Sequence, residues 1–422
     1  MWESLKRVWN IEELRNSLLF ILFVLVVFRI AAHITVPGID ASGVSALLNS
    51  NQFLGLLNVF SGGTIANFSI VALGVGPYIT ASIIFQLLGM IFPSIEEMQK
   101  EEQGRQKINK WTRWAVVPFA FIQGYGLLNL LGASSGQTAF GLSPLEIVFA
   151  LISMTAGTIF LMWLGELISE RNVGNGISIL ILAGIIASLP QFLQQTIVTY
   201  DSSELINLVL IAVLTIVTVV AVVIVNEGQR NIPIQYARGV RGGSGGGAAM
   251  SHLPMRVNMG GMIPIIFAIS IMVFPPLVAQ FFLEARTGVV RSAAEFTLEL
   301  FGNSAFYGIL YFLLVFGFTF FYASVVFKPD NIAENLQKQG AFIPGIRPGK
   351  QTENYLNFVK NRLLLTGATF LGVIAVLPLI VQEVTGSQNL VVGGASVLIL
   401  VAVIIDMLKQ IESQVAMRSY DN

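Results

Sequence analysis

The sequence predicts an all-α integral membrane protein with ten transmembrane helices. Of its 422 residues, 54% are hydrophobic and only 11% are charged, a balance that one soluble core of ordinary proportions cannot bury. About 20 apolar residues span the hydrocarbon layer of a bilayer, and ten runs of this kind follow one another along the chain. Their centres lie near Leu25, Ser82, Gln123, Thr155, Ile185, Thr215, Ser270, Phe316, Gly372 and Leu400.

The Lys and Arg residues orient the chain, because basic loops stay on the cytoplasmic side of a membrane. With a cytoplasmic N-terminus, only Arg286 and Arg291 fall in outer loops and Arg29 falls inside the first run, so 21 of the 24 basic residues lie on the cytoplasmic side. Ten spans bring both termini to that side. No small-residue cleavage site follows the first run, which we therefore expect to remain as an anchor.

Residues suited to metal, redox or hydrolytic chemistry are few. The chain has no cysteine, and its two histidines, His33 and His252, fall on opposite sides of the membrane in this topology, so we expect no metal site and no redox cofactor. The string GASSG at residues 132–136 matches the nucleophile pattern G-x-S-x-G, but it lies in an outer loop and not in a strand–turn–helix elbow. We expect no enzyme activity.

Two long cytoplasmic loops, residues 227–258 and 328–362, are too short and too rich in Gly and Pro to form independent domains, and we expect them to offer docking surface. The first contains a glycine-rich run at residues 242–247, which behaves as flexible coil. In the second, prolines and glycines flank Arg347 and favour a stiff, exposed tip. A stiff tip lowers the entropic cost of docking.

The stretch between the first two spans has an unusual pattern. An apolar stretch breaks at Ser61, Gly62 and Gly63 before a full span begins. Non-helical backbone at membrane depth is tolerated only where protein or a water-filled cavity surrounds it, so this stretch predicts an internal cavity. The alternative is an interfacial helix over residues 51–67. Gly74, Gly76 and Pro77 are expected to kink the second span near the cavity.

A pore lined by these apolar runs would have few ionisable side chains in its wall. Acidic groups inside the membrane would favour ion-coupled transport, but Glu146, Glu166 and Asp406 each lie near the end of a run, and the centres of the runs hold no acidic residue. A channel for ions would want rings of carbonyls or charges. A pore that passes a polypeptide without leaking ions needs a compliant ring of aliphatic side chains, so Ile and Val on hinged helices are the candidates.

Seven strings of residues are specific enough to suggest a family. They are PGID from Pro37, FSGG from Phe60, PYITASII from Pro77, WLGELISERNVGNGISILI from Trp163, HLPMRVNMGGMIPIIFA from His252, AFIPGIRPGKQTENYL from Ala341 and GGAS from Gly393. Together they resemble the SecY family, the channel subunits of bacterial Sec translocases, over nearly the whole chain. The resemblance implies two five-helix halves, residues 1–197 and 198–422, around an hourglass pore in the bacterial cytoplasmic membrane.

The resemblance also implies a function and a set of pore residues. The function is a protein-conducting channel that translocates unfolded secretory proteins and releases membrane proteins sideways into the bilayer. The pore ring would be Val75, Ile79, Ile177, Ile181, Ile266 and Ile399. The plug that closes the outer side would be Phe60, Ser61, Gly62, Gly63, Thr64, Ile65, Ala66, Asn67 and Phe68. Asn67 stands where many relatives carry arginine, so the likeness gives no charge-based account of how this plug is held.

The lateral gate of the family would be the seam between spans two and three on one side and spans seven and eight on the other. Thr80, Gln86 and Gln123 are polar residues suited to this seam. Hydrogen bonds between membrane helices are worth roughly 0.6 to 2 kcal/mol each. Bonds of this strength would let the gate open.

Arg347 matches an arginine at the family's docking tip for the ribosome or the SecA motor. Relatives tend to hold an Arg pair and a Tyr at the tip of the preceding loop, where this chain has Gly243, Ser244 and Gly246. Remaining docking contacts would fall to Arg238, Arg241 and Arg256. The implied partners are SecE and SecG, SecA with ATP or the translating ribosome, a precursor polypeptide with its signal sequence, and membrane lipids. A secondary transporter of small solutes and an insertase without a through-pore are the alternatives.

Overall fold

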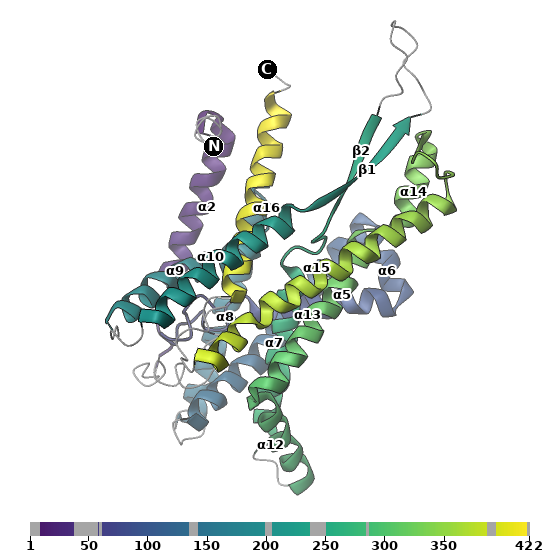
Figure 1. The fold of residues 1–422 in the computed structure, drawn as a ribbon. Coiled ribbons are helices and arrows are strands. Elements are labelled where there is room, and N and C mark those ends of the chain that lie inside the picture. The colour runs from purple at the N-terminus through teal and green to yellow at the C-terminus, as the bar shows by residue number, and fades with distance from the viewer. Residues whose placement is uncertain are drawn as a thin grey trace, which may run out of the picture.

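The computed structural model describes residues 9–37, 58, 61–134, 142–198, 205–236, 250–283, 287–385 and 394–419. Most of these residues form helices packed side by side (Figure 1). The helices are α2 (Glu12–Ala31), α5 (Gly76–Ile91), α6 (Pro93–Lys100), α7 (Glu102–Ser134), α8 (Pro144–Ser169), α9 (Gly176–Val198), α10 (Leu205–Glu227), α11 (Ile263–Phe282), α12 (Gly288–Gly302), α13 (Ser304–Val326), α14 (Pro329–Lys338), α15 (Lys350–Thr385) and α16 (Gly394–Ser419). Each of the ten predicted centres falls inside a separate helix, which confirms the expected helical membrane architecture.

Five helical stretches among the described residues are long and apolar enough to cross a membrane alone: α2, α8, α11, α13 with α14, and α15. The bent pair α5 and α6 makes a possible sixth, with an angle of 110° between its two helices. The bend falls at Phe92, which is extended because the following residue is Pro93. We conclude that α5 belongs to the helical bundle and that α6 turns away from it.

Two hydrophobic clusters form most of the core. One joins α2, α8 and α9 to α16 and to the starts of α5 and α11. The other joins α10, α11, α13 and α15 to the same α16. Two membrane-helix groups therefore meet along α11 and α16, while the division at residues 197 and 198 stays a prediction.

The second span begins differently from what the sequence led us to expect. Residues 61–75 form a series of turns, Gly74 has a φ of +56°, and α5 begins only at Gly76. Pro77 therefore sits in the first turn of the helix, where its missing N–H would have had no partner. The expected kink at Gly74, Gly76 and Pro77 thus falls beside the cavity, but it precedes the helix instead of bending it.

The two loops predicted to be cytoplasmic fold together into a small sheet that was not expected from the sequence. Strands β1 (Gln229–Tyr236) and β2 (Met250–Arg256) form an antiparallel hairpin, and β3 (Ala341–Phe342) pairs with the other edge of β1. In β1, the buried Ile232 and Ile234 flank an exposed residue, the alternation of a half-buried strand. The second loop is also largely helical, with α14 before the tip and α15 beginning at Lys350.

The hairpin marks one end of the molecule (Figure 1). The start of α2, the end of α16 and α14 lie at this same end, and α12 lies at the opposite end. This arrangement agrees with a chain that crosses the membrane an even number of times, with the large basic loops on one side.

The turn between α8 and α9 is held by backbone contacts of small residues. Ser169 Oγ donates a hydrogen bond to the carbonyl of Gly165 (2.9 Å) and accepts one from the N–H of Gly176 (2.9 Å). Asn172 adopts a φ of +57°, and its carbonyl accepts a hydrogen bond from Gln414 Nε2 of α16 (2.6 Å). The turn is thus fixed at both ends and tied to the last helix.

Gly157→Ala is expected to lower the free energy of unfolding by about 1–3 kcal/mol. A Cβ at Gly157 of α8 would overlap the carbonyl of Ile70, so the turns at residues 61–75 would have to move. Thermal unfolding in detergent measures the effect. Gly317→Ala in α13 is the matched control, because nothing lies within 4 Å of its added Cβ. Equal shifts in the two variants would contradict this packing.

Candidate functional site

A small, mostly apolar cavity lies where α5, α7, α9 and α11 meet residues 61–75. Its volume is about 80 Å³, enough for only a few water molecules. Aliphatic side chains make most of its wall, and the side chains that bring polar groups are Ser61, Thr80, Gln123 and Ser270. No charged residue of the described chain lines it. The cavity is therefore a small, uncharged space at the meeting point of four helices.

Four of the six predicted pore-ring residues line this cavity: Val75, Ile79, Ile181 and Ile266. The other two, Ile177 and Ile399, pack in the same hydrophobic cluster as these four but do not line the cavity. Ile399 is fully buried, whereas Ile177 is half-buried. The six side chains thus converge from different helices, while their role as a seal stays a prediction.

The predicted plug residues that the structure describes form a compact set of turns. Thr64 Oγ1 donates to the carbonyls of Ser61 (2.8 Å) and Val71 (3.2 Å), which closes the turns on themselves. Ser61 and Ile65 line the cavity, and Phe68 is fully buried with a φ of +44°. Phe60 lies outside the described residues. We call residues 61–68 the plug segment.

The plug segment is held by backbone contacts from two sides. The N–H of Val36 donates to the carbonyl of Phe68 (2.9 Å), and the N–H of Ile70 donates to the carbonyl of Ile34 (2.9 Å). On the other side, a Cβ built on Gly62 would lie 2.6 Å from the Cα of Gly184 in α9. Two glycines therefore allow the backbone of this segment to touch that of α9.

Two of the three predicted gate residues meet each other. Gln123 Nε2 of α7 donates to Thr80 Oγ1 of α5 (3.1 Å), and both residues line the cavity. Gln86 instead donates to Ser82 Oγ of its own helix (3.0 Å). The Gln123–Thr80 bond joins spans two and three, which lie on the same side of the predicted seam. Their role in gating stays a prediction.

The predicted seam is closed by other contacts. The rings of Tyr125 in α7 and Phe281 in α11 lie 4.7 Å apart, and Gly126 packs against Leu277. At the end near the cytoplasmic loops, Lys328 Nζ after α13 lies 3.7 Å from Glu96 Oε1 of α6.

Glu96 is shared between two lysines. Its Oε1 also lies 3.2 Å from Lys100 Nζ, and the hydrogen bond from Lys100, more than the ion pair with Lys328, lowers the pKa of Glu96 from its ordinary value. Exposed ion pairs of this kind are weak and screened by salt. The aromatic and aliphatic contacts of α7 and α11 therefore do more to close the seam than the charges at its end.

A protein-family comparison identifies the chain. The model of the SecY family matches residues 69–408, which is most of the 422 residues. The chain belongs to the SecY family.

Curated relatives agree with this membership along the full length. The chain is 41% identical to the protein translocase subunit SecY of Halalkalibacterium halodurans, covering 100% of this chain and 99% of that protein. It is 40% identical to the SecY of Escherichia coli, covering 98% and 94%. It is 39% identical to that of Thermotoga maritima, covering 100% and 97%.

Solved structures share the fold. A structure described as a protein-conducting channel superposes with a TM-score of 0.62 at 21% identity, covering 93% of this chain and 91% of the other. A SecY structure, described in terms of a plug domain that stabilises the closed state of the translocation channel, gives a TM-score of 0.61 at 22% identity with the same coverage. The expected SecY-type architecture is confirmed.

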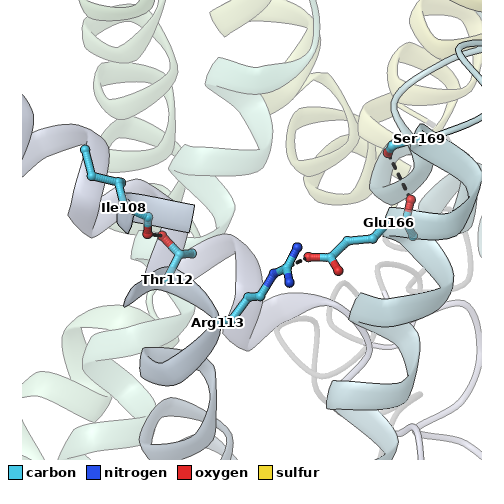
Figure 2. A network of polar contacts seen from close by, with 6 residues as sticks. Ile108, Thr112, Arg113, Glu166 and Ser169 are labelled. Atoms are coloured by element: carbon cyan, nitrogen blue, oxygen red, sulfur yellow. Dashed lines mark hydrogen bonds and ion pairs between the residues drawn. The ribbon is translucent and has the colours of Figure 1, made fainter. Parts of the chain in front are cut away.

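One acidic residue of this SecY-family chain that could have relayed protons has a structural partner. Arg113 Nε of α7 lies 2.7 Å from Glu166 Oε1 of α8, and Figure 2 shows the two side chains reaching across the gap between their helices. From the sequence, Arg113 was only one of the basic residues that orient the chain in the membrane. No pattern near it in the sequence predicts Glu166 as its partner. The pair ties spans three and four together near the loops predicted to be cytoplasmic.

The docking tip of this SecY-family chain is exposed and braced, as the sequence predicted. Arg347 is exposed, and its carbonyl accepts a hydrogen bond from Thr352 Oγ1 (3.0 Å). Gly345 and Gly349 have φ values of +81° and +94°, which favour glycine. Ile343 is buried beneath the sheet, so the tip stands on a small core.

The other predicted docking arginines differ in what the structure describes. Arg256 lies at the end of β2 and lines a second cavity of about 210 Å³, together with Asn258 and Asp406. Arg238 and Arg241 lie outside the described residues.

Within the described part of the chain, no group of three or more His, Asp or Glu side chains is placed to hold a metal ion.

Proposed function

We propose that this chain is the protein-conducting channel of a Sec translocase in the cytoplasmic membrane of a bacterium. It translocates unfolded secretory proteins and releases membrane proteins laterally into the bilayer. The observation that carries the proposal is the small, uncharged cavity, which helices from both groups surround and against which the plug segment packs. A solute transporter would instead need a polar site at this depth.

The pore ring acts as a seal in this proposal. Val75, Ile79, Ile181 and Ile266 line the cavity, and Ile177 and Ile399 back them within one cluster. Aliphatic walls at a constriction exclude water and therefore ions. Because side chains without strong directional bonds can rearrange, the same ring can fit around an extended polypeptide of any sequence.

The plug segment and the seam supply the two ways of opening. Displacement of residues 61–68 opens the outer side of the pore for a secretory protein. Separation of α5 and α7 from α11 and α13 opens the side wall for a signal sequence, with Thr80, Gln86 and Gln123 as the polar residues that tune this step. Each hydrogen bond lost there costs roughly 0.6 to 2 kcal/mol, and the binding of a signal sequence can offset this cost.

Energy comes from a partner, because the channel itself performs no catalysis in this proposal. SecA with ATP or a translating ribosome docks on the exposed Arg347, with Arg256 and, from the adjoining loop, Arg238 and Arg241 as further contacts. SecE and SecG complete the complex in the membrane, with both termini of this chain in the cytoplasm. The Sec61 channel, a structural neighbour at a TM-score of 0.60, is described in a ribosome–channel complex, which supports a ribosome as a partner.

Site-specific crosslinking tests the channel function. A photoreactive residue at Ile79 or Ile266 is expected to crosslink to the mature region of a stalled precursor in membranes that contain SecE and SecA. The same residue at Ile309, exposed on α13 away from the cavity, is the control and is expected to give no mature-region crosslink. Failure at both cavity positions, with the precursor demonstrably bound, would contradict a polypeptide path through this constriction.

A further inference from the structure

Arg29 contacts the plug segment directly. Its Nη1 donates a hydrogen bond to the carbonyl of Gly62 (3.2 Å), 33 residues further along the chain. Arg29 lies in the last turn of α2, in an apolar run where a charged side chain is costly unless it finds a polar partner. The guanidinium of Arg29 therefore has a specific binding partner, a carbonyl of the plug segment.

Gly62 is also the point where the plug segment meets two helices. Its backbone touches that of Gly184 in α9, and a Cβ built at this position would lie 3.5 Å from the ring of Phe28 in α2. Gly62 is buried and has a φ of +78°. The carbonyl that Arg29 binds is thus fixed in direction by a glycine turn and in position by backbone contact with α9.

We propose that Arg29 is the positioning residue of the plug: its hydrogen bond to Gly62 holds residues 61–68 against α9 in the closed channel, and this bond breaks when the plug moves. The inference rests on the proposed function. A hydrogen bond from a charged donor is stronger than a neutral one, and low surrounding dielectric strengthens it. One such bond at the contact point can therefore shift the balance between seated and displaced plug.

The plug segment itself carries no charged side chain that could replace this bond, since its sequence is SGGTIANF. Thr64 satisfies carbonyls within the segment, and Asn58 Oδ1 accepts from the N–H of Ala66 (3.0 Å). These bonds shape the turns and do not reach α2 or α9. The Arg29 bond is one that ties the segment's first turn to a neighbouring helix.

Thiol labelling tests the proposal, because the chain has no cysteine and an introduced one is the sole thiol. Ser61→Cys is nearly isosteric, and Ser61 is 7% exposed. A membrane-impermeant maleimide added from the outer side should label this position slowly in the closed channel. Arg29→Met is expected to raise the labelling rate about tenfold. Arg29→Lys, which keeps a charged donor, is expected to stay within about threefold of the parent rate.

Two controls separate hydrogen bonding from other effects. Arg291→Met removes an exposed arginine at the outer side that pairs with Glu295 (2.8 Å), and it should leave the labelling rate unchanged. If Arg29→Met fails to fold, Arg29→Gln, which also removes the charge, takes its place and is expected to raise labelling. Unchanged labelling in the uncharged variants, or an equal rise in the Lys and uncharged variants, would overturn the proposal.

Ion conductance measured on the same variants distinguishes this inference from the proposed function. A rise in both labelling and resting conductance supports Arg29 as the plug-positioning residue of a sealed channel. Faster labelling with unchanged conductance supports the positioning role and removes the plug from the seal. Neither change, in channels that still give the mature-region crosslink at Ile79, overturns the role of Arg29 alone.

Discussion

Replacing both Ile79 and Ile181 with glycine is expected to make the closed channel leak ions, with at least a tenfold rise in resting conductance. The two side chains face one cavity of about 80 Å³ from α5 and α9. Their removal leaves room for a continuous column of water where aliphatic walls had excluded it. The measurement is conductance of the purified complex in a planar bilayer, without precursor or motor.

The matched control uses the same two helices and the same chemistry. Ile91→Gly with Ile186→Gly removes isoleucines from α5 and α9 that are exposed at the protein surface and do not line the cavity. Glycine in a helix costs about 1 kcal/mol relative to alanine in both cases, so the controls also report loss of helix stability. Equal conductance in the two double variants would remove Ile79 and Ile181 from the seal.

Arg347→Glu is expected to reduce partner-driven translocation at least tenfold while leaving the fold intact. The side chain of Arg347 is exposed. The hydrogen bond from Thr352 that braces the tip is accepted by the backbone carbonyl of Arg347 and not by its side chain. Charge reversal should therefore affect a docking partner and not the tip. A tenfold loss corresponds to about 1.4 kcal/mol, within the range of one charge-assisted contact. Export into membrane vesicles measures the rate, and thermal unfolding checks the fold.

Lys338→Glu is the matched control for the docking prediction. Lys338 ends α14, is exposed, and pairs only with Glu334 one turn earlier (2.7 Å). Reversing this charge changes the same end of the molecule by the same amount without touching the tip. Normal export by Arg347→Glu, or an equal loss in both variants, would contradict a specific docking role for Arg347.

The membrane architecture could be predicted from the sequence because an apolar run of membrane length has few other uses. All ten predicted centres, including Ser82 in the short α5, lie in separate helices. The sequence also predicted an aliphatic pore wall, because the centres of the apolar runs hold no acidic residue. Which isoleucines line the cavity, such as Ile181 and not Ile186, could not be found from periodicity in helices that are apolar on every side, and the choice of Ile181 came from the family resemblance.

The sheet and the Arg29 contact could not be predicted because they depend on partners distant in the chain. Strand β1 is short, and the residue between Ile232 and Ile234 is Pro233, a residue type that argues against a strand. Its pairing with β3 joins segments more than 100 residues apart, for which no local pattern exists. The acceptor of Arg29 is a backbone carbonyl, and its only sequence signal was a pair of glycines at a break.

The tip that carries Arg347 has a mechanical consequence. Directly after it, α15 runs for 36 residues as one helix, with Pro378 in its last third, a length of about 54 Å at 1.5 Å per residue. Leu356 and Val359 near its start share a small core with the sheet, and its later turns belong to the cluster that contains α11. A partner that docks on the tip, as proposed, would therefore load one long helix, which passes the force along its length to α13 and α16, the membrane helices packed against it.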